Sequence, residues 1–182
     1  MLERPVNPTQ LLVSALDQVQ AWESRLELKR GELLKEANTS DTHIYRVQSG
    51  SLRVFVVDGH EEHTIRLAYQ GNILVALDSF FTEEPSDLVI EALKRGAIDR
   101  ISKSAFFAFL NAHDLWDTWH ATLPILILQQ MERERDLLTS SPAERYQRVL
   151  KRSPQVFQEI PHKYIAAYLR MTPETLSRVQ KS

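Results

Sequence analysis

The six histidines are the first candidates for metal binding or acid–base chemistry in this 182-residue sequence, because it contains no cysteine. The lack of cysteine excludes disulfides, iron–sulfur ligation and thiol catalysis. The closest two histidines are His60 and His63, which flank Glu61-Glu62 in a predicted hairpin and do not form the helical H-E-x-x-H motif of zinc enzymes. The other histidines stand at positions 43, 113, 120 and 162. We therefore predict no metal site.

Motifs for other kinds of catalysis are also missing from the sequence. It contains no P-loop, no glycine-rich dinucleotide-binding turn and no recognisable pairing of a nucleophile with a base. We expect the protein not to be an enzyme, and we predict no cofactor.

The end of the chain, IPHKYIAAYLRMTPETLSRVQKS (residues 160–182), has the pattern of two short helices joined by a turn. We predict a first helix over 162–168 and a turn over 169–171. Thr172 is the expected cap of the second helix and Pro173 its first residue. The positions predicted to pack the two helices together are Ile165, Ala166, Leu169, Met171, Leu176 and Val179. A helical hairpin that only closes a core is the alternative interpretation.

The outer face of the second helix carries polar and cationic side chains of the types that contact DNA. Such side chains reach base edges and phosphates in the major groove. The predicted DNA-binding residues are Lys163, Thr172, Pro173, Glu174, Thr175, Ser177, Arg178 and Lys181.

The charge of the chain is unevenly distributed. Residues 142–182 have eight Lys or Arg against three Asp or Glu, whereas residues 1–141 carry an excess of seven acidic groups. A segment with a net charge of +5 can contact several phosphates and release their counterions. A solvated helical surface explains the same charge equally well.

Strand patterns occupy the region from about residue 26 to residue 103, where apolar residues alternate or form short β-branched runs between turn signals. Asp58-Gly59 lies between two alternating runs and predicts a β-hairpin with a tight turn. These features predict an antiparallel barrel or roll.

The period becomes helical from about residue 104. Pro124 is expected to kink the long helix or to mark its true start, and Ser141 with Pro142 should begin the next helix. One side of the long helix is wide enough to pack against a partner, with Trp116, Trp119, Leu123, Leu126, Met131 and Leu138.

Nearly the whole chain resembles the CRP/FNR family of bacterial transcription regulators, the dimeric relatives of the catabolite activator protein. The resemblance lies in RGELLKEANTSDTHIYRVQSGSLRVFVV with Gly31 and Gly50 at strand turns, YQGNILVAL with Gly71, the long helix and the terminal helix pair. It implies an α+β fold. We expect an antiparallel β-roll of the cyclic-nucleotide-binding type as sensor (1–112), a dimerisation helix with hinge (113–140) and a helix-turn-helix DNA-binding domain (141–182).

The resemblance also implies the partners of the chain. They are double-stranded DNA, a second copy of the chain, RNA polymerase and an unidentified small-molecule effector, without a membrane. It identifies the six apolar positions of the long helix as the dimer interface. We expect a cytoplasmic location for another reason: no stretch approaches the roughly 18–20 apolar residues that span a bilayer, and the N-terminus lacks the pattern of a signal peptide.

Two departures from the family pattern affect the recognition helix. Glu174 and Arg178 fall on base-reading positions, but Pro173 replaces the usual Arg and removes a contact of about 1–3 kcal/mol. The operator should therefore differ from the best-known one. Arg170 replaces the usual Gly of the turn and would adopt a left-handed conformation at a cost of about 1–2 kcal/mol.

The effector site departs further from the family pattern. Members that bind cyclic AMP hold it with the Glu of a Gly-Glu pair and the Arg of an Arg-Ser-Ala-like turn, whereas this chain has Val75-Ala76 and Ser86-Asp87-Leu88 near Gly71. Because an Asp near the phosphate would repel it, we predict no useful cyclic AMP binding.

The sequence leaves two questions open. The first is what the roll binds: either an apolar pocket lined by RLAY (66–69) and ILVALDSFF (73–81) takes a different small molecule, or the roll is a rigid scaffold without a ligand. The second is the function itself. The alternative function is a sensor or scaffold module of the cyclic-nucleotide-binding type that acts through protein contacts without binding DNA.

Overall fold

The alternating apolar residues form two four-stranded antiparallel sheets, with the strand orders β1-β8-β3-β6 and β2-β7-β4-β5. The computed structural model describes residues 7–181, so the ends of the predicted first and last domains, 1–6 and 182, lie outside it. The strands are β1 (Ser24–Leu28), β2 (Leu33–Lys35), β3 (His43–Val47), β4 (Ser51–Asp58), β5 (Glu61–Tyr69), β6 (Ile73–Val75), β7 (Val89–Lys94) and β8 (Gly96–Ser102). The predicted α+β class with an antiparallel roll is confirmed.

Strand alternation sends apolar side chains to both faces of the first sheet. Tyr45 and Leu74 point into the roll and join a core to which both sheets contribute. Ile44 and Ile73, the neighbours of those residues in sequence, belong to a second core on the outer face of the same sheet. That outer core is completed by α1 (Pro8–Gln18), α2 (Leu77–Thr82), α3 (Lys103–Ala112) and α4 (Trp116–Leu138).

Two tight turns cross at one end of the roll. Gly50 has a φ of 81°, in the left-handed region that favours glycine. A Cβ atom on Gly96 would lie 2.0 Å from the Ser49 carbonyl oxygen, so only glycine fits there. The β4–β5 hairpin turns at Gly59 and His60, one residue later than Asp58-Gly59, because Asp58 pairs with Glu61.

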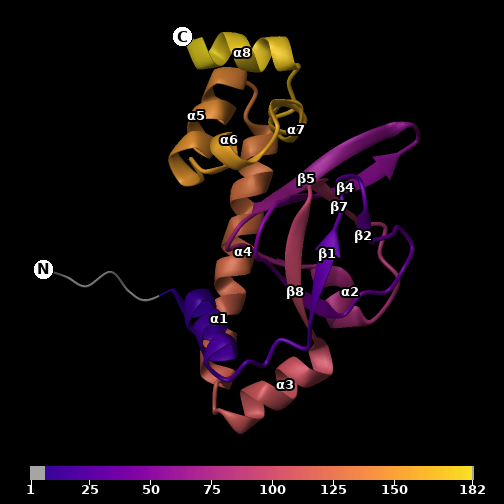
Figure 1. Ribbon diagram of the computed structural model, residues 1–182. Helices are drawn as coiled ribbons and strands as arrows, with labels where there is room; N and C mark the ends of the chain where they lie inside the picture. Colours follow the sequence, from indigo (N-terminus) through magenta and orange to yellow (C-terminus); the bar gives the residue numbers. More distant parts are fainter. Residues whose placement is uncertain (1–6, 182) are drawn as a thin grey trace, which may run out of the picture.

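Helix α4 connects the roll to the C-terminal helices (Figure 1). Its 23 residues run without interruption through Pro124, so this proline does not mark the start of the helix. At 1.5 Å per residue the helix is roughly 34 Å long. Figure 1 shows α1 alongside its first half. Helix α5 packs beside its last turns, where Arg148 and Arg152 reach Asp136.

The C-terminal helices are α5 (Pro142–Arg152), α6 (Val156–Glu159), α7 (His162–Tyr168) and α8 (Pro173–Lys181). Ser141 caps α5 through its side chain, with Pro142 as the first helical residue, as predicted. These helices share a hydrophobic core with Leu67 of β5 and Leu93 of β7. In Figure 1, α8 lies at the end of the molecule that is farthest from α3.

Candidate nucleic-acid interface

Helices α7 and α8 begin and end where the sequence predicts, at 162–168 and after Thr172. The hydroxyl oxygen of Thr172 accepts a hydrogen bond of 3.2 Å from the backbone N–H of Thr175, which caps α8. Arg170 has a φ of 51°, the left-handed conformation expected for this non-glycine residue. The turn therefore keeps its shape without a glycine.

The packing between α7 and α8 uses the predicted apolar positions. Ile165, Ala166, Leu169 and Leu176 are buried in the C-terminal core, together with Val149 of α5. The other two predicted positions, 171 and 179, are half-buried. A side-chain contact of 3.3 Å between His162 and Gln180 joins the two helices at the surface.

The predicted DNA-binding residues lie mostly on the solvent side of this helix pair. The exposed members are Lys163, Thr172, Pro173, Glu174, Arg178 and Lys181, whereas Thr175 and Ser177 are half-buried. Hydrogen bonds from its own backbone amide and from the Thr172 hydroxyl lower the pKa of Glu174. Its ionised carboxylate is a hydrogen-bond acceptor, the role needed to contact a cytosine amino group.

The positive charge of the C-terminal segment is only partly available to a ligand. Three of its eight cationic residues, Arg145, Arg148 and Arg152, bind groups of the chain itself. The other five are exposed and, within residues 7–181, have no carboxylate at ion-pair distance: Lys151, Lys163, Arg170, Arg178 and Lys181. These five are the cations that could contact phosphates.

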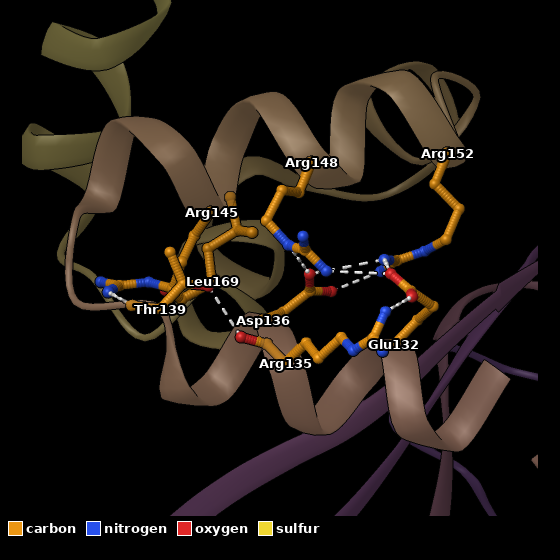
Figure 2. Close-up of polar contacts among 8 residues, drawn as sticks. All are labelled: Glu132, Arg135, Asp136, Thr139, Arg145, Arg148, Arg152 and Leu169. Atoms are coloured by element: carbon orange, nitrogen blue, oxygen red, sulfur yellow. Dashed lines mark hydrogen bonds and ion pairs between the residues drawn. The ribbon is translucent and has the colours of Figure 1, made fainter. Parts of the chain in front are cut away.

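An ionic network joins α4 to α5 (Figure 2). Asp136 of α4 is fully buried and accepts hydrogen bonds from Arg148 Nε at 2.9 Å and from an Arg152 terminal nitrogen at 2.5 Å. Glu132, one helical turn earlier, accepts a bond of 2.9 Å from Arg148. Burial acts to raise the pKa of Asp136, but the hydrogen bonds from Arg152 and Arg148 outweigh it, and the pKa is lowered.

Arg145 connects the end of α4 to the turn that precedes α8. Its guanidinium donates to the carbonyl oxygens of Thr139 and Leu169, both at 2.7 Å, and to that of Arg170 at 3.1 Å. Carbonyl oxygens at a helix end need such donors. Arg145 therefore ties the turn before α8 to the end of α4, next to the ionic network of Figure 2.

The C-terminal helices also contact the roll through a buried arginine. Arg133 of α4 is 5% exposed and donates to the Thr64 carbonyl of β5 at 2.9 Å. Its guanidinium lies 3.7 Å from the ring centroid of Tyr168 in α7, which is a cation–π contact. Burial lowers the pKa of Arg133. The roll, α4 and α7 meet at this residue.

A buried lysine holds the turn that corresponds to the predicted effector site. Lys35 is 4% exposed, and its amino group donates to the carbonyl oxygens of Glu36, Ser86 and Leu88 at 3.1, 3.0 and 2.7 Å. An ammonium group has three donors, so all are used. The Asp87 side chain of this turn is exposed.

The remaining residues of the predicted effector pocket lie at strand β6 and its turns. Gly71 has a φ of 84° in the turn before β6. Ala76 is buried, and Val75 packs against the outer core, away from the roll interior. The predicted positions therefore do not share one core: Val75 packs against the outer core, whereas Leu88 packs against the core inside the roll.

The six predicted interface residues of α4 lie on two faces of the helix. Trp119 is 6% exposed inside the outer core, and Trp116 and Leu123 pack against the same core. Leu126 lines a pocket of the chain, so four of the six contact other parts of the same chain. Met131 and Leu138 are exposed, at 45% and 84%.

The exposed apolar face of α4 includes residues that the sequence pattern did not single out. Ile127 and Leu128 are 60% and 59% exposed, and Pro124 is exposed as well. Pro124, Leu128, Met131 and Leu138 are spaced as on one seam of a coiled coil. These side chains have no partner within residues 7–181 that covers them.

Comparison with known proteins identifies the type of domain that the roll forms. Residues 25–113 match the family model described as cyclic nucleotide-binding domain, which is just under half of the chain. No curated protein matches the sequence. The described residues contain no helix with the length and apolar character needed to cross a membrane.

The solved structures that match this fold include a catabolite activator protein, a global regulator and FixK2. The catabolite activator protein of Thermus thermophilus has 21% identity and a TM-score of 0.57, over 92% of this chain and 81% of that one. The c-di-GMP responsive global regulator CLP of Xanthomonas campestris has 13% identity and a TM-score of 0.66, over 93% and 90%. FixK2 of Bradyrhizobium japonicum has 16% identity and a TM-score of 0.67, over 87% and 82%. At these identities the likeness shows a shared fold.

Proposed function

We propose that this protein is a sequence-specific DNA-binding transcription regulator of the CRP/FNR type. The observation that supports it most is the exposure of Glu174, Arg178 and Lys181 on α8. Helix α8 itself lies at the outer end of the molecule (Figure 1). Arg can pair with guanine in the major groove and Glu can accept from cytosine. The five exposed cations would supply the phosphate contacts.

We propose further that the active form is a homodimer with α4 as its seam. The exposed apolar side chains Pro124, Ile127, Leu128, Met131 and Leu138 would form the seam, because Trp119, Leu123 and Leu126 pack within the chain. A twofold axis along α4 would place two α8 helices on one DNA duplex, roughly 34 Å apart for a palindromic site.

Salt-dependent binding to duplex DNA tests the proposal. Preferred sequences would first be selected from a random pool of duplexes with the purified protein. The logarithm of the binding constant should then fall linearly with the logarithm of the salt concentration, by about 0.9 for each phosphate neutralised. Binding that has neither a salt slope nor a preferred sequence would contradict the proposed function.

Two single substitutions should separate base reading from phosphate contact. Arg178→Ala should weaken binding to the preferred duplex by about 1–3 kcal/mol and relax base preference at one position. Lys163→Ala should weaken binding to all duplexes by a similar factor and reduce the salt slope by about 1. Fluorescence anisotropy on preferred and scrambled duplexes measures both. Equal, sequence-independent losses from the two variants would remove Arg178 from base reading.

The proposed dimer seam can be tested by introducing one negative charge within it and, as a control, the same charge at the neighbouring residue. Leu128→Glu puts a carboxylate in the centre of the proposed seam and should weaken dimerisation at least tenfold, about 1.4 kcal/mol. Gln129→Glu adds the same charge one residue away and should leave dimerisation unchanged. Sedimentation velocity measures the monomer–dimer equilibrium. A dimer of Leu128→Glu as stable as the unmodified one would place the seam elsewhere.

We also propose that cyclic AMP is not the effector. The turn at Ser86–Leu88 has no arginine, and the three N–H groups of the Lys35 ammonium all donate to backbone carbonyl oxygens. A phosphate at this turn would meet Asp87 and no free cation from these residues.

A second candidate function is a scaffold of the cyclic-nucleotide-binding type that does not bind DNA. The observation that favours it is the shared core between the C-terminal helices and strands β5 and β7, together with the three arginines that bind groups of the chain itself. A rigid attachment of this kind suits a module that acts through protein contacts. The absence of a salt slope in the DNA experiment would favour this candidate.

A further inference from the structure

A cavity lies between α1, the outer face of the first sheet and α4. It is lined by Ile44 of β3 and Ile73 of β6, whose side chains point away from the roll interior. Tyr45 and Leu74, the next residues along these strands, fill the roll interior on the other face of the sheet. The cavity is therefore separate from the space between the two sheets.

The walls of this cavity are apolar except at one charged residue. Eleven of its fourteen described lining residues are apolar, and Thr9 and Thr122 contribute hydroxyl groups. The remaining lining residue is Arg66 of β5. An apolar pocket with one convergent charged group is the usual form of a site for a small organic ligand.

Arg66 lacks a counter-charge. It is half-buried, and within residues 7–181 no carboxylate lies at ion-pair distance from it. Its side-chain hydrogen bond goes to the Gln130 amide oxygen of α4, at a long 3.5 Å. Burial lowers the pKa of Arg66, since the charged form is partly desolvated. A carboxylate would supply the missing charge and accept two N–H bonds from the guanidinium.

The size of the cavity limits the ligand. Its volume is about 50 Å³. One water molecule needs about 10–15 Å³ of such space, so the cavity has room for roughly three to five non-hydrogen atoms. A short alkyl chain fits this space, whereas a nucleotide base or a larger ring system does not.

We propose that this cavity binds a short straight-chain monocarboxylate, with its alkyl chain among the apolar walls and its carboxylate on Arg66. The ligand class extends from butyrate to hexanoate, whose alkyl chains beyond the carboxyl carbon have three to five carbon atoms and match the cavity volume. The carboxylate itself would lie outside this volume, at the Arg66 guanidinium beside the exposed Gln130. Trp119 and Leu126 of α4 form part of the wall, so the ligand contacts the helix that carries the C-terminal helices. Its role as an effector rests on the proposed function, whereas binding itself does not.

Tryptophan fluorescence provides a direct readout, because Trp22 and Trp119 line the cavity. Sodium acetate, butyrate, hexanoate and decanoate would be titrated into the full-length protein, with 1-butanol and butylamine as controls. We expect saturable changes, with butyrate and hexanoate binding tighter than acetate, decanoate or either control. Absence of saturation by any carboxylate, or equal affinity for 1-butanol, would overturn the proposal.

Two variants test the two ends of the ligand. Arg66→Gln should weaken butyrate binding at least tenfold, and Arg30→Gln, a change at an exposed arginine, should leave it unchanged. Val13→Phe places a larger side chain of α1 in the cavity, so the carboxylate that binds most tightly should have a shorter alkyl chain. Circular dichroism verifies that each variant is folded. Unchanged butyrate affinity in Arg66→Gln, or an unchanged chain-length optimum in Val13→Phe, would overturn the assignment.

The fluorescence experiment needs no DNA. Loss of the carboxylate site with intact DNA binding would refute only this inference. Carboxylate binding without DNA binding would refute only the proposed function.

Discussion

Trp119→Ala is expected to lower the free energy of unfolding by about 3–5 kcal/mol, the usual range for removing a buried aromatic side chain. Trp119 is 6% exposed, and its ring lies 5.2 Å from that of Phe106 and 6.2 Å from that of Phe80, both edge-on. The substitution would leave a cavity in the outer core, where the roll meets α3 and α4. Urea denaturation followed by circular dichroism measures the change.

The dependence on protein concentration distinguishes a core residue from a seam residue. Unfolding of a dimer depends on concentration, and removal of a seam side chain changes that dependence. Trp119→Ala should therefore keep the same loss of stability at low and high protein concentration. Leu128→Ala, on the exposed face, should lose stability mainly through weaker dimerisation. If the loss of stability in Trp119→Ala depended strongly on protein concentration, Trp119 would belong to the dimer seam and not to the core.

The helix pair at the end of the chain was predictable because its signals are local. Thr172 and Pro173 define the start of α8, and the apolar spacing of residues 165 to 176 requires two crossing helices. The roll was predictable for a similar reason, since strand alternation is visible over short windows. The one-residue shift of the β4–β5 turn shows the limit, because Asp58 and Gly59 are both turn formers and only cross-strand pairing decides between them.

The two faces of α4 could not be separated from the sequence. Residues 123–128 form a continuous apolar run, and apolar side chains occur on both sides of the helix, with Trp119 and Leu123 on one side and Leu128 and Met131 on the other. Helical periodicity identifies a wide stripe but not which part of it meets the chain's own core. That choice depends on α1 and α3, which are distant in sequence.

The long-range contacts of the buried charged side chains could not be predicted from the sequence either. Lys35 and Arg133 look like solvated surface residues in the sequence, but both are buried and bind backbone carbonyl oxygens 51 and 69 residues away. The network of Asp136 had a weak signal: Glu132 and Asp136 are four residues apart in α4, and Arg148 and Arg152 have the same spacing in α5. Such spacing places each pair on one helix face.

Asp136→Asn should lower the free energy of unfolding by roughly 2–4 kcal/mol at neutral pH, because it leaves two guanidinium groups facing a neutral amide at a buried position. Removing one member of a fully buried ion pair costs about 3–5 kcal/mol. We discount that range because the Arg148 and Arg152 side chains are 35% and 30% exposed and are partly solvated. Glu134→Gln removes an exposed carboxylate from the same helix and should change stability by less than about 0.5 kcal/mol.

The effect of Asp136→Asn should depend on pH in a defined direction. The pKa of Asp136 is lower in the folded protein than the ordinary value of about 3.9. A depressed carboxyl pKa contributes stability that is fully present above the unfolded value and is lost as pH falls through the folded one. The difference between the unmodified protein and Asp136→Asn, measured by urea denaturation, should thus be constant near neutral pH and shrink below about pH 4. A difference that stays the same through this range, or one no larger than that of Glu134→Gln, would mean that the carboxylate does not hold α5 against α4.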